Sequence, residues 1–244
     1  MITTVIFDLD GTLLRFNQAA FVELYFKKLG KVFADMGMNP EQSMQAVWGG
    51  TKAMLLNDGT CLNIVRFWDY FVGAMSLTAD EKEVVEKNCD EFYTKDFDNV
   101  KSVLAPNSVG EDNISKKIVH ELKQKGYEIV LATNPLFPQC AVETRLSWIG
   151  LNLDDFKLVT HYANSSFCKP NLGYYKEVLS KIGKKAEQCL MVGNNPAEDM
   201  CASQLGMDVY FVNEYVEGGD GVDTSTLQQG TLDDFHTFQE GTLK

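Results

Sequence analysis

The sequence has 244 residues, enough to bury a large core either as one domain or as a core that carries an insertion. A hydrophobic fraction of 45% and an aromatic fraction of 11% exclude a disordered or low-complexity chain. The 22 basic and 34 acidic residues give a net charge of −12, and the sequence has no dense run of lysine and arginine, so nucleic acid is not an expected partner.

Cysteine spacing and the N-terminal residues bear on the compartment. The six cysteines form no CxxC pair and no cluster with histidine, so neither a zinc site nor a redox pair is indicated. The chain starts with a strand-like segment rather than a basic region followed by an apolar stretch, and no apolar run approaches the length needed to span a bilayer. We therefore expect reduced thiols, no membrane partner and a cytoplasmic location.

The first predicted strand, residues 2–7, is a run of β-branched and aromatic residues typical of a strand buried in a parallel sheet. It leads directly into Asp8 and Asp10, which are followed by Gly11. If the strand continued, these two side chains would point to the same face, and their carboxylates would repel each other. A bound cation or a raised pKa on one carboxylate relieves the repulsion, and both conditions suit phosphoryl chemistry.

Residues from about 16 to 93 carry apolar side chains at helical spacing and predict about four helices, with no strand signal between them. Breaks are expected at residues 37–40, 57–59 and 76–78. Thr78 and Glu81 predict a capping box at the start of the fourth helix.

After Ala105-Pro106, helices and strands alternate. We predict helices at 112–125, 137–149, 171–182 and 197–205, and strands at 127–132, 157–160, 188–192 and 209–212. Single helices between strands imply right-handed βαβ units and a parallel sheet with helices on both faces. The predicted fold is a doubly wound, Rossmann-like α/β core (residues 1–15 and 105–244) with an inserted α-helical segment (residues 16–104). The residues after Asn213 carry no chemical signal.

Ligands of such sheets bind at the carboxyl ends of the strands, and four polar segments are expected to meet there. The first strand ends at Asp8 and Asp10, and the second at Thr133-Asn134. The loop after the third strand carries Lys169-Pro170, and the fourth strand ends in residues 193–199, which include two asparagines and two acidic residues.

This ordered set of segments resembles the haloacid dehalogenase superfamily, in particular its phosphatase branch with an all-helical cap, as in phosphoglycolate phosphatases. The resemblance covers nearly the whole chain. It implies a hydrolase that acts on a small phosphorylated metabolite through an aspartyl-phosphate intermediate, with Mg²⁺ as the cofactor. Residues 16–104 would be the cap that closes over the site.

The resemblance also assigns roles to single residues. Asp8 would be the nucleophile, and Asp10 the general acid and then the general base. Thr133 would hydrogen-bond a phosphoryl oxygen together with main-chain amides around Leu9 and Asn134. Lys169 would balance negative charge on Asp8 and on the phosphoryl group, because an attacking carboxylate is otherwise repelled by the phosphate.

Magnesium would be held by the Asp8 carboxylate, the Asp10 main-chain carbonyl, Asn194 and Asp199. The family usually has an aspartate after the glycine of this segment, whereas this chain has Asn194 and then Asn195. An asparagine offers a carbonyl oxygen without a charge, so a lower metal affinity is one expectation. Spacing leaves open which of Asn194, Asn195 and Asp199 contacts the ion.

Other branches of the superfamily give alternative functions, because one fold supports several chemistries. Asp10 argues against carbon-halogen chemistry and against phosphonate cleavage, since neither branch has an acid at this position. A sugar phosphomutase keeps both acids, and only Thr12 favours hydrolysis over it. A binding or regulatory protein with weakened turnover is suggested by Asn194 and Asn195.

The cap residues expected to set specificity are grouped in two short segments. An alternative interpretation makes Trp48 a core aromatic and its neighbouring glycines a helix break. The candidates are Phe16, Asn17, Trp48, Gly49, Gly50, Thr51 and Lys52.

Overall fold

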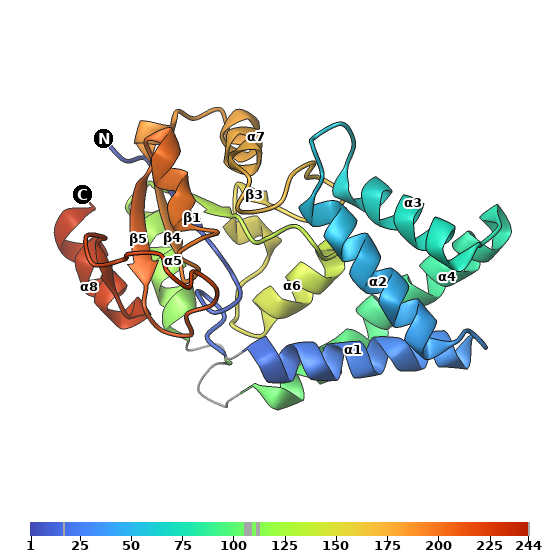
Figure 1. The fold of residues 1–244 in the computed structure, drawn as a ribbon. Coiled ribbons are helices and arrows are strands. Elements are labelled where there is room, and N and C mark those ends of the chain that lie inside the picture. Colours follow the sequence, from blue (N-terminus) through green and yellow to red (C-terminus); the bar gives the residue numbers. More distant parts are fainter. Residues whose placement is uncertain (17, 105–108, 111–112, 244) are drawn as a thin grey trace.

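The sheet is the centre of the larger part of the molecule in Figure 1. The computed structural model describes residues 1–16, 18–104, 109–110 and 113–243. Six parallel strands pair in the order β3-β2-β1-β4-β5-β6. Their bounds are β1 (Thr4–Phe7), β2 (Glu128–Leu131), β3 (Leu158–Val159), β4 (Cys189–Gly193), β5 (Asp208–Val212) and β6 (Gln229–Gly230).

Helices lie between most of the successive strands, one more follows the last strand, and together they cover the sheet. They are α5 (Ile114–Gln124), α6 (Gln139–Ser147), α7 (Leu172–Ile182), the 3₁₀ helix η6 (Met200–Leu205) and α8 (Leu232–Thr242). Strand β1 pairs with β2 on one side and with β4 on the other, so the chain leaves the sheet after β1 and returns beside it twice. This order confirms the doubly wound α/β fold predicted from the alternation of helices and strands.

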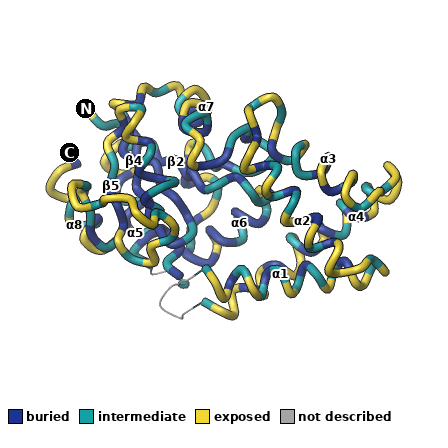
Figure 2. Tube along the Cα trace, in the orientation of Figure 1, coloured by how far each residue is buried: buried dark blue, intermediate teal, exposed yellow. Residues whose placement is uncertain are grey.

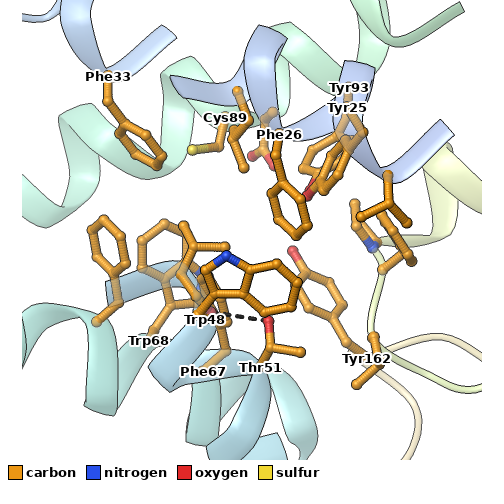
Figure 3. A pocket seen from close by; sticks show the side chains of 18 of the residues that line it. Tyr25, Phe26, Phe33, Trp48, Thr51, Phe67, Trp68, Cys89, Tyr93 and Tyr162 are labelled. Atoms are coloured by element: carbon orange, nitrogen blue, oxygen red, sulfur yellow. Dashed lines mark hydrogen bonds between the residues drawn. The ribbon is translucent and has the colours of Figure 1, made fainter. Parts of the chain in front are cut away.

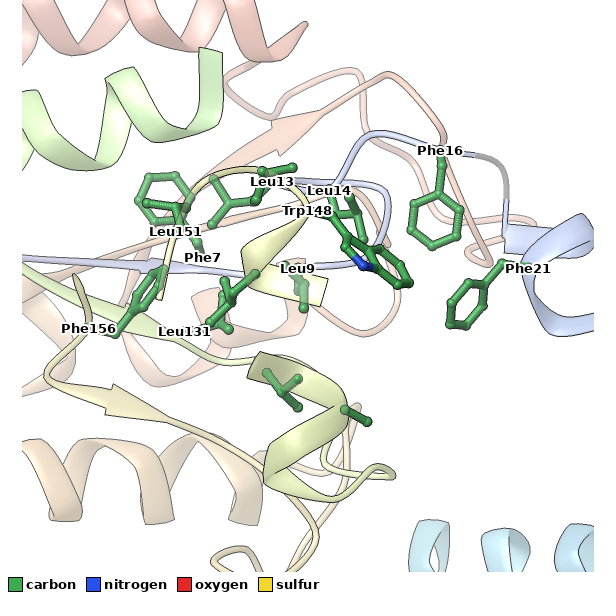
Figure 4. Close-up of a cluster of buried hydrophobic side chains, with 14 of the residues drawn as sticks. Phe7, Leu9, Leu13, Leu14, Phe16, Phe21, Leu131, Trp148, Leu151 and Phe156 are labelled. Carbon is green, nitrogen blue, oxygen red and sulfur yellow. The ribbon is translucent and has the colours of Figure 1, made fainter. Parts of the chain in front are cut away.

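Alternate residues of β1 point into two different apolar clusters, as expected for a strand buried on both faces. Val5 and Phe7 belong to the larger cluster, whereas Ile6 packs with Tyr174 and Val178 of α7. The larger cluster also contains residues of α5, α6 and α8 and continues past the end of β1 to Phe16 and Phe21 (Figure 4). The core therefore holds β1, and the loop that follows it, in a fixed position.

A second group of helices lies beside the sheet (Figure 1). It consists of α1 (Gln18–Asp35), α2 (Pro40–Leu55), α3 (Asn63–Met75) and α4 (Ala79–Glu91), followed by the π-helix η1 (Phe92–Asp96) and the 3₁₀ helix η2 (Phe97–Val103). The four predicted helices are present, and Thr78 and Glu81 form the predicted capping box. The central strands β1 and β4 are fully buried, whereas α1 exposes much of its outer surface (Figure 2).

One predicted helix differs from the structure, and one segment without a predicted element contains a strand and a helix. The helix expected at 197–205 is only the 3₁₀ helix η6, because Asn195 and Asp199 hold the preceding residues in a loop through side-chain hydrogen bonds to main-chain N–H groups. The residues after Asn213, for which nothing was predicted, form β6 and α8. Three predictions fall on residues outside the described part of the chain. They are the boundary expected at 104/105, the first residue of the helix expected at 112–125, and the specificity candidate at position 17.

The cysteine side chains agree with the expectation of reduced thiols that was drawn from their spacing. All six cysteines are free. Within the described residues, no helix is both long enough and apolar enough to cross a membrane.

Candidate active site

A cleft of about 180 Å³ lies at the carboxyl ends of β1, β2 and β4. This is the edge of the sheet at which the sequence predicted a site. Polar and acidic side chains from widely separated parts of the chain line it. They are Asp8, Asp10, Gln18, Thr133, Asn134, Asn194, Asn195, Glu198, Asp199 and Glu217, with Leu136 and Phe137 as apolar members.

The loop after β1 depends on Gly11. Its φ is +84°, which disfavours any residue with a Cβ, and a Cβ built there would lie 2.1 Å from Asn194 Nδ2. The Asp8 N–H donates to the carbonyl of Val192 in β4 at 2.9 Å, and the Thr12 hydroxyl donates to Asn194 Oδ1 at 3.1 Å. The tight turn and these contacts fix both aspartates against the end of β4.

Lys169 lies between two carboxylates in the floor of the site. Its Nζ donates to Asp8 Oδ1 at 2.8 Å and to Asp199 Oδ1 at 2.6 Å, and the lysine side chain is 1% exposed. Burial acts to lower the pKa of Lys169, but Asp199 and Asp8 outweigh it and raise this pKa well above its ordinary value. The lysine therefore carries a positive charge directly beside Asp8.

Asp199 has both carboxylate oxygens on protein donors. Oδ1 accepts from Lys169, and Oδ2 accepts from the Asn195 N–H at 2.9 Å. Burial raises the pKa of Asp199 to about 7, Lys169 lowers it and Asp8 raises it. These contacts make Asp199 the partner that holds Lys169 and the Asn195 main chain in place.

Asp10 pairs with Arg145, which the sequence analysis did not single out. The guanidinium Nη1 of Arg145 donates to Asp10 Oδ2, and the arginine side chain is fully buried. Within the described residues, Asp10 Oδ1 is buried and has no hydrogen-bond partner. Burial raises the pKa of Asp10, Arg145 lowers it, and Asp8 raises it; the net direction is upward. A carboxyl with a raised pKa and a free oxygen is suited to donate a proton.

Thr133 and Asn134 follow β2 in the position that the sequence predicted. The Thr133 carbonyl accepts from the hydroxyls of Thr160 at 2.7 Å and Tyr174 at 2.9 Å, so it points away from the cleft that the residue lines. The Asn134 side chain donates to Glu198 at 3.0 Å and accepts from the Lys169 N–H at 3.3 Å. Both residues thereby connect β2 to the Lys169 loop.

The two asparagines after β4 are both engaged with the protein. Asn194 Oδ1 accepts from Thr12, and its Nδ2 donates to the Tyr215 carbonyl at 2.6 Å. Asn195 Oδ1 accepts from the N–H groups of Ala197 and Glu198 at 3.1 and 3.0 Å. An aspartate at position 194 would set a negative oxygen against the Tyr215 carbonyl, which gives a local reason for an amide there.

Two further carboxylates, Glu198 and Glu217, line the cleft. Burial raises the pKa of Glu198 despite the nearby Lys169. Burial, Asp10 and Asp8 raise the pKa of Glu217 to about 7, against a lowering effect of a hydrogen bond from the Gln18 main chain. Carboxylates crowded in this way favour a cation among them. The donors are all oxygen, which is the ligand set of Mg²⁺, so the residues present fit that ion.

The structure thus brings together every side chain that the sequence placed at this edge: Asp8, Asp10, Thr133, Asn134, Lys169, Asn194, Asn195 and Asp199. The side chain of Leu9 is buried in the core, so the role predicted for Leu9 rests on its main-chain amide alone. Arg145 and Glu217 were missed. Arg145 falls on the apolar stripe of its helix, with Val142 and Leu146, where a charged residue is unusual; Glu217 lies in a segment with no regular pattern.

Comparisons with known proteins agree with this geometry. The sequence profile of the haloacid dehalogenase-like hydrolases matches residues 2–219. A glyceraldehyde 3-phosphate phosphatase from Methanothermobacter thermautotrophicus is 26% identical over 98% of this chain and 99% of its own length.

Two solved structures share the fold along nearly the whole of both chains. One is a HAD phosphatase from Thermococcus onnurineus, with a TM-score of 0.58, 18% identity and coverage of 98% of this chain and 99% of that one. The other is a 2-haloacid dehalogenase from Pseudomonas syringae pv. Tomato DC3000, with a TM-score of 0.63, 17% identity and coverage of 99% of both. Because these two enzymes are named for different reactions, the shared fold does not show which of the two reactions this chain catalyses.

Proposed function

The chain belongs to the haloacid dehalogenase-like hydrolases, and from that premise we propose that it is a Mg²⁺-dependent phosphatase of a small phosphomonoester. The observation that carries the proposal is the pairing of the two aspartates with separate buried cations. Lys169 contacts Asp8 at 2.8 Å, and Arg145 pairs with Asp10. The two carboxylates therefore have different surroundings and are suited to different tasks.

In the proposed first step, Asp8 attacks phosphorus. A bond forms between a carboxylate oxygen of Asp8 and the phosphorus atom, and the bond from phosphorus to the alcohol oxygen breaks. Asp10 donates its proton to that leaving oxygen, for which its raised pKa and free Oδ1 are suited. In the second step Asp10 accepts a proton from a water molecule that attacks the aspartyl phosphate, and inorganic phosphate and the free Asp8 carboxylate are released.

The transferred phosphoryl group needs positive charge and hydrogen-bond donors around its oxygens. Lys169 supplies the charge from the floor of the site. The Thr133 hydroxyl and the main-chain amides of Leu9 and Asn134 are the proposed donors. The carbonyl of Thr133 is already held by Thr160 and Tyr174, so its side chain is presented from a fixed main chain.

The proposed ion ligands are the Asp8 carboxylate, the main-chain carbonyl of Asp10, Asn194 and Asp199. The Asp10 carbonyl now accepts from Gln18 Nε2 at 3.2 Å, and the oxygens of Asn194 and Asp199 have protein partners, so direct bonds to an ion require these side chains to exchange partners. When bound, Mg²⁺ neutralises negative charge on the phosphoryl oxygens. The uncharged Asn194 is expected to lower the affinity for the ion relative to an aspartate.

Residues 16–104 are proposed as the cap, with α1–α4 covering the side of the cleft where the alcohol leaves. Gln18, at the start of α1, lines the cleft directly. The similarity to a glyceraldehyde 3-phosphate phosphatase supports a small phosphorylated metabolite as the substrate. Such a substrate is compatible with the proposed cytoplasmic location.

The test is phosphate release from a panel of phosphorylated metabolites, with Mg²⁺ and with EDTA. We expect release that needs Mg²⁺ and that falls by roughly 10³-fold or more in Asp8→Asn, because the nucleophile is removed. Asp35→Asn, the same change at an exposed position on α1, is the matched control and keeps full activity. Conversion of a sugar phosphate to its isomer without phosphate release would instead identify a phosphomutase, and no turnover of any compound would contradict both.

A further inference from the structure

A second cavity, of about 210 Å³, lies among α1, α2, α3 and the loop before α6 (Figure 3). We call it the aromatic cavity. Most of its wall is carbon: phenylalanine, tyrosine and tryptophan rings alternate with aliphatic side chains. The lining residues are Gln18, Val22, Tyr25, Phe26, Leu29, Phe33, Val47, Trp48, Thr51, Phe67, Trp68, Phe71, Cys89, Asp90, Tyr93, Leu136, Phe137, Pro138 and Tyr162.

The aromatic cavity adjoins the catalytic cleft. Gln18, Leu136 and Phe137 line both, and the Gln18 side chain donates to the main-chain oxygen of Asp10 at 3.2 Å. The guanidinium of Arg145, which pairs with Asp10, lies 4.6 Å from the centre of the Phe137 ring. The aromatic cavity therefore begins beside the residue that is proposed to protonate the leaving alcohol.

Several polar groups on the wall are already engaged by the protein. The hydroxyls of Tyr25 and Tyr93 hydrogen-bond each other at 2.6 Å, and the Thr51 hydroxyl donates to the Val47 carbonyl at 2.9 Å. Trp68 Nε1 is buried and, within the described residues, has no partner. Tyr162 and Asp90 add two further polar side chains to the wall, so a ligand oxygen finds a few partners here, whereas the remaining hydroxyls of a polyol would be buried without one, which is costly.

The alternative interpretation of Trp48 as a core aromatic is not supported by its position. Its side chain is 53% exposed and packs on Phe26 with the ring centres 4.4 Å apart, at the aromatic cavity. Thr51, one turn further along α2, lines the same space. Two of the expected specificity residues, Trp48 and Thr51, thus line the aromatic cavity.

Resting on the proposed phosphatase function, we propose that the substrate is a phosphomonoester of an apolar alcohol, whose carbon skeleton occupies the aromatic cavity while its phosphate lies in the cleft. Binding pockets for such groups are lined mainly by apolar and aromatic side chains. A dry cavity of roughly 150 Å³ holds a benzene ring, so 210 Å³ accommodates a substituted ring or an alkyl chain of similar volume. A three-carbon aldehyde such as glyceraldehyde leaves most of this wall uncovered.

The first test compares n-alkyl phosphates from methyl to hexyl, whose alcohols differ little in acidity, with glycerol 3-phosphate and glyceraldehyde 3-phosphate. We expect kcat/KM to rise by roughly threefold for each methylene that enters the aromatic cavity. Hexyl phosphate should exceed both polar phosphates by at least about tenfold on the same basis. A kcat/KM that is independent of chain length, or highest for the polar phosphates, overturns the inference and leaves the phosphatase proposal intact. No release from any ester overturns both.

The second test fills the aromatic cavity. Val22 lies one turn beyond Gln18 on α1 and lines the cavity, so Val22→Phe occupies space next to its junction with the cleft. We expect the ratio of kcat/KM for hexyl phosphate to that for methyl phosphate to fall about tenfold, since roughly two methylenes lose their place. Val84→Phe, the same change at an exposed position on α4, should leave the ratio unchanged. If Val22→Phe does not fold, the alkyl series in the unmodified protein still decides.

Discussion

Arg145 holds one carboxylate oxygen of Asp10, Oδ2, and leaves the other oxygen, Oδ1, without a hydrogen-bond partner among the described residues. The arginine Nε donates to the Ala141 carbonyl of its own helix at 3.2 Å, and its guanidinium stacks over Phe137. The guanidinium therefore has little freedom, and its pairing with Asp10 Oδ2 sets the direction of the carboxyl. Arg145 acts as a positioning residue, because it holds the proposed acid without lying in the cleft that receives the substrate.

Arg145→Met is expected to keep the volume of the side chain while it removes the charge. Asp10 then loses the partner that orients it, so kcat for phosphate release should fall by roughly 10- to 100-fold with KM changed less. The buried pair is also broken, so the free energy of unfolding should fall by about 3 kcal/mol. Steady-state kinetics and urea denaturation measure the two effects.

Lys31→Met is the control for Arg145→Met. Lys31 pairs with Asp35 at 2.6 Å on the exposed side of α1, so the loss of this pair should leave stability and kcat nearly unchanged. Retention of the full kcat by folded Arg145→Met would show that Asp10 is oriented by other contacts.

The residues predicted from the sequence share one property that Arg145 lacks. Asp8, Thr133 and Lys169 follow predicted strands, so topology alone brings them to one edge of the sheet. Arg145 lies inside α6, and only the packing of that helix decides whether its side chain faces the site or solvent. Its place on an apolar stripe was a signal of burial, but the partner could not be identified without the packed structure.

At the level of elements, α3 begins on the core rather than in solvent. The main-chain N–H groups of Asn63 and Ile64 donate to the carbonyls of Ser165 at 2.8 Å and Tyr162 at 2.9 Å. The buried side chain of Asn63 donates to the carbonyls of Pro135 at 3.3 Å and Phe167 at 3.2 Å. Core loops thus satisfy N–H groups that a helix start leaves without intrahelical partners, and they fix the proposed cap to the core at this point.

Asn63→Ala should weaken that attachment. The carbonyls of Pro135 and Phe167 lose a donor in a buried setting, so the free energy of unfolding is expected to fall by about 2 kcal/mol. Asn88→Ala on α4, whose side chain bonds an exposed carbonyl of its own helix, should change stability by less than about 0.5 kcal/mol. Equal effects of the two substitutions in chemical denaturation would show that the Asn63 contacts add nothing to the stability of the fold.

Element prediction succeeded where hydrophobic periodicity was strong and failed where side chains compete for the main chain. The helices α1–α4 of the proposed cap have long amphipathic patterns, and their number and order were predicted. Residues 197–199 belong to the helix predicted at 197–205, but Asn195 caps the N–H groups of Ala197 and Glu198 and keeps these residues in a loop. The residues after Asn213 have no period, so their path across the cleft could not be predicted.

At the scale of the whole molecule, five of the 34 acidic residues meet where the proposed ion would bind. Five carboxylates, from Asp8, Asp10, Glu198, Asp199 and Glu217, line one cleft, while the cations Lys169 and Arg145 pair with three of them. Glu217 arrives from the segment that follows β5, far along the chain from the first strand. Without a bound cation, this arrangement should make the stability of the folded protein depend on pH.

Glu217 illustrates the sign of that dependence, which the raised pKa values of Asp10, Glu198 and Asp199 share. Burial, together with Asp10, Asp8 and Glu198, raises its pKa to about 7, although the Gln18 main chain donates to it. A carboxyl whose pKa is higher in the folded state binds more protons there, so folding stability decreases as the pH rises from the ordinary glutamate value toward 7. In EDTA, Glu217→Gln should therefore be more stable than the unmodified protein above pH 7.

The difference should be about 1 kcal/mol above pH 7, after allowance for the partial exposure of Glu217, and should vanish below about pH 4, where the carboxyl is protonated in both states. Urea denaturation between these limits measures it. Asp220→Asn removes one exposed charge from the same segment. Its free energy of unfolding, plotted against pH, should run parallel to that of the unmodified protein. If the free energy of unfolding of Glu217→Gln also runs parallel to that of the unmodified protein, then the crowded carboxylates do not destabilise the folded protein in EDTA. The electrostatic reason for a cation among them then fails.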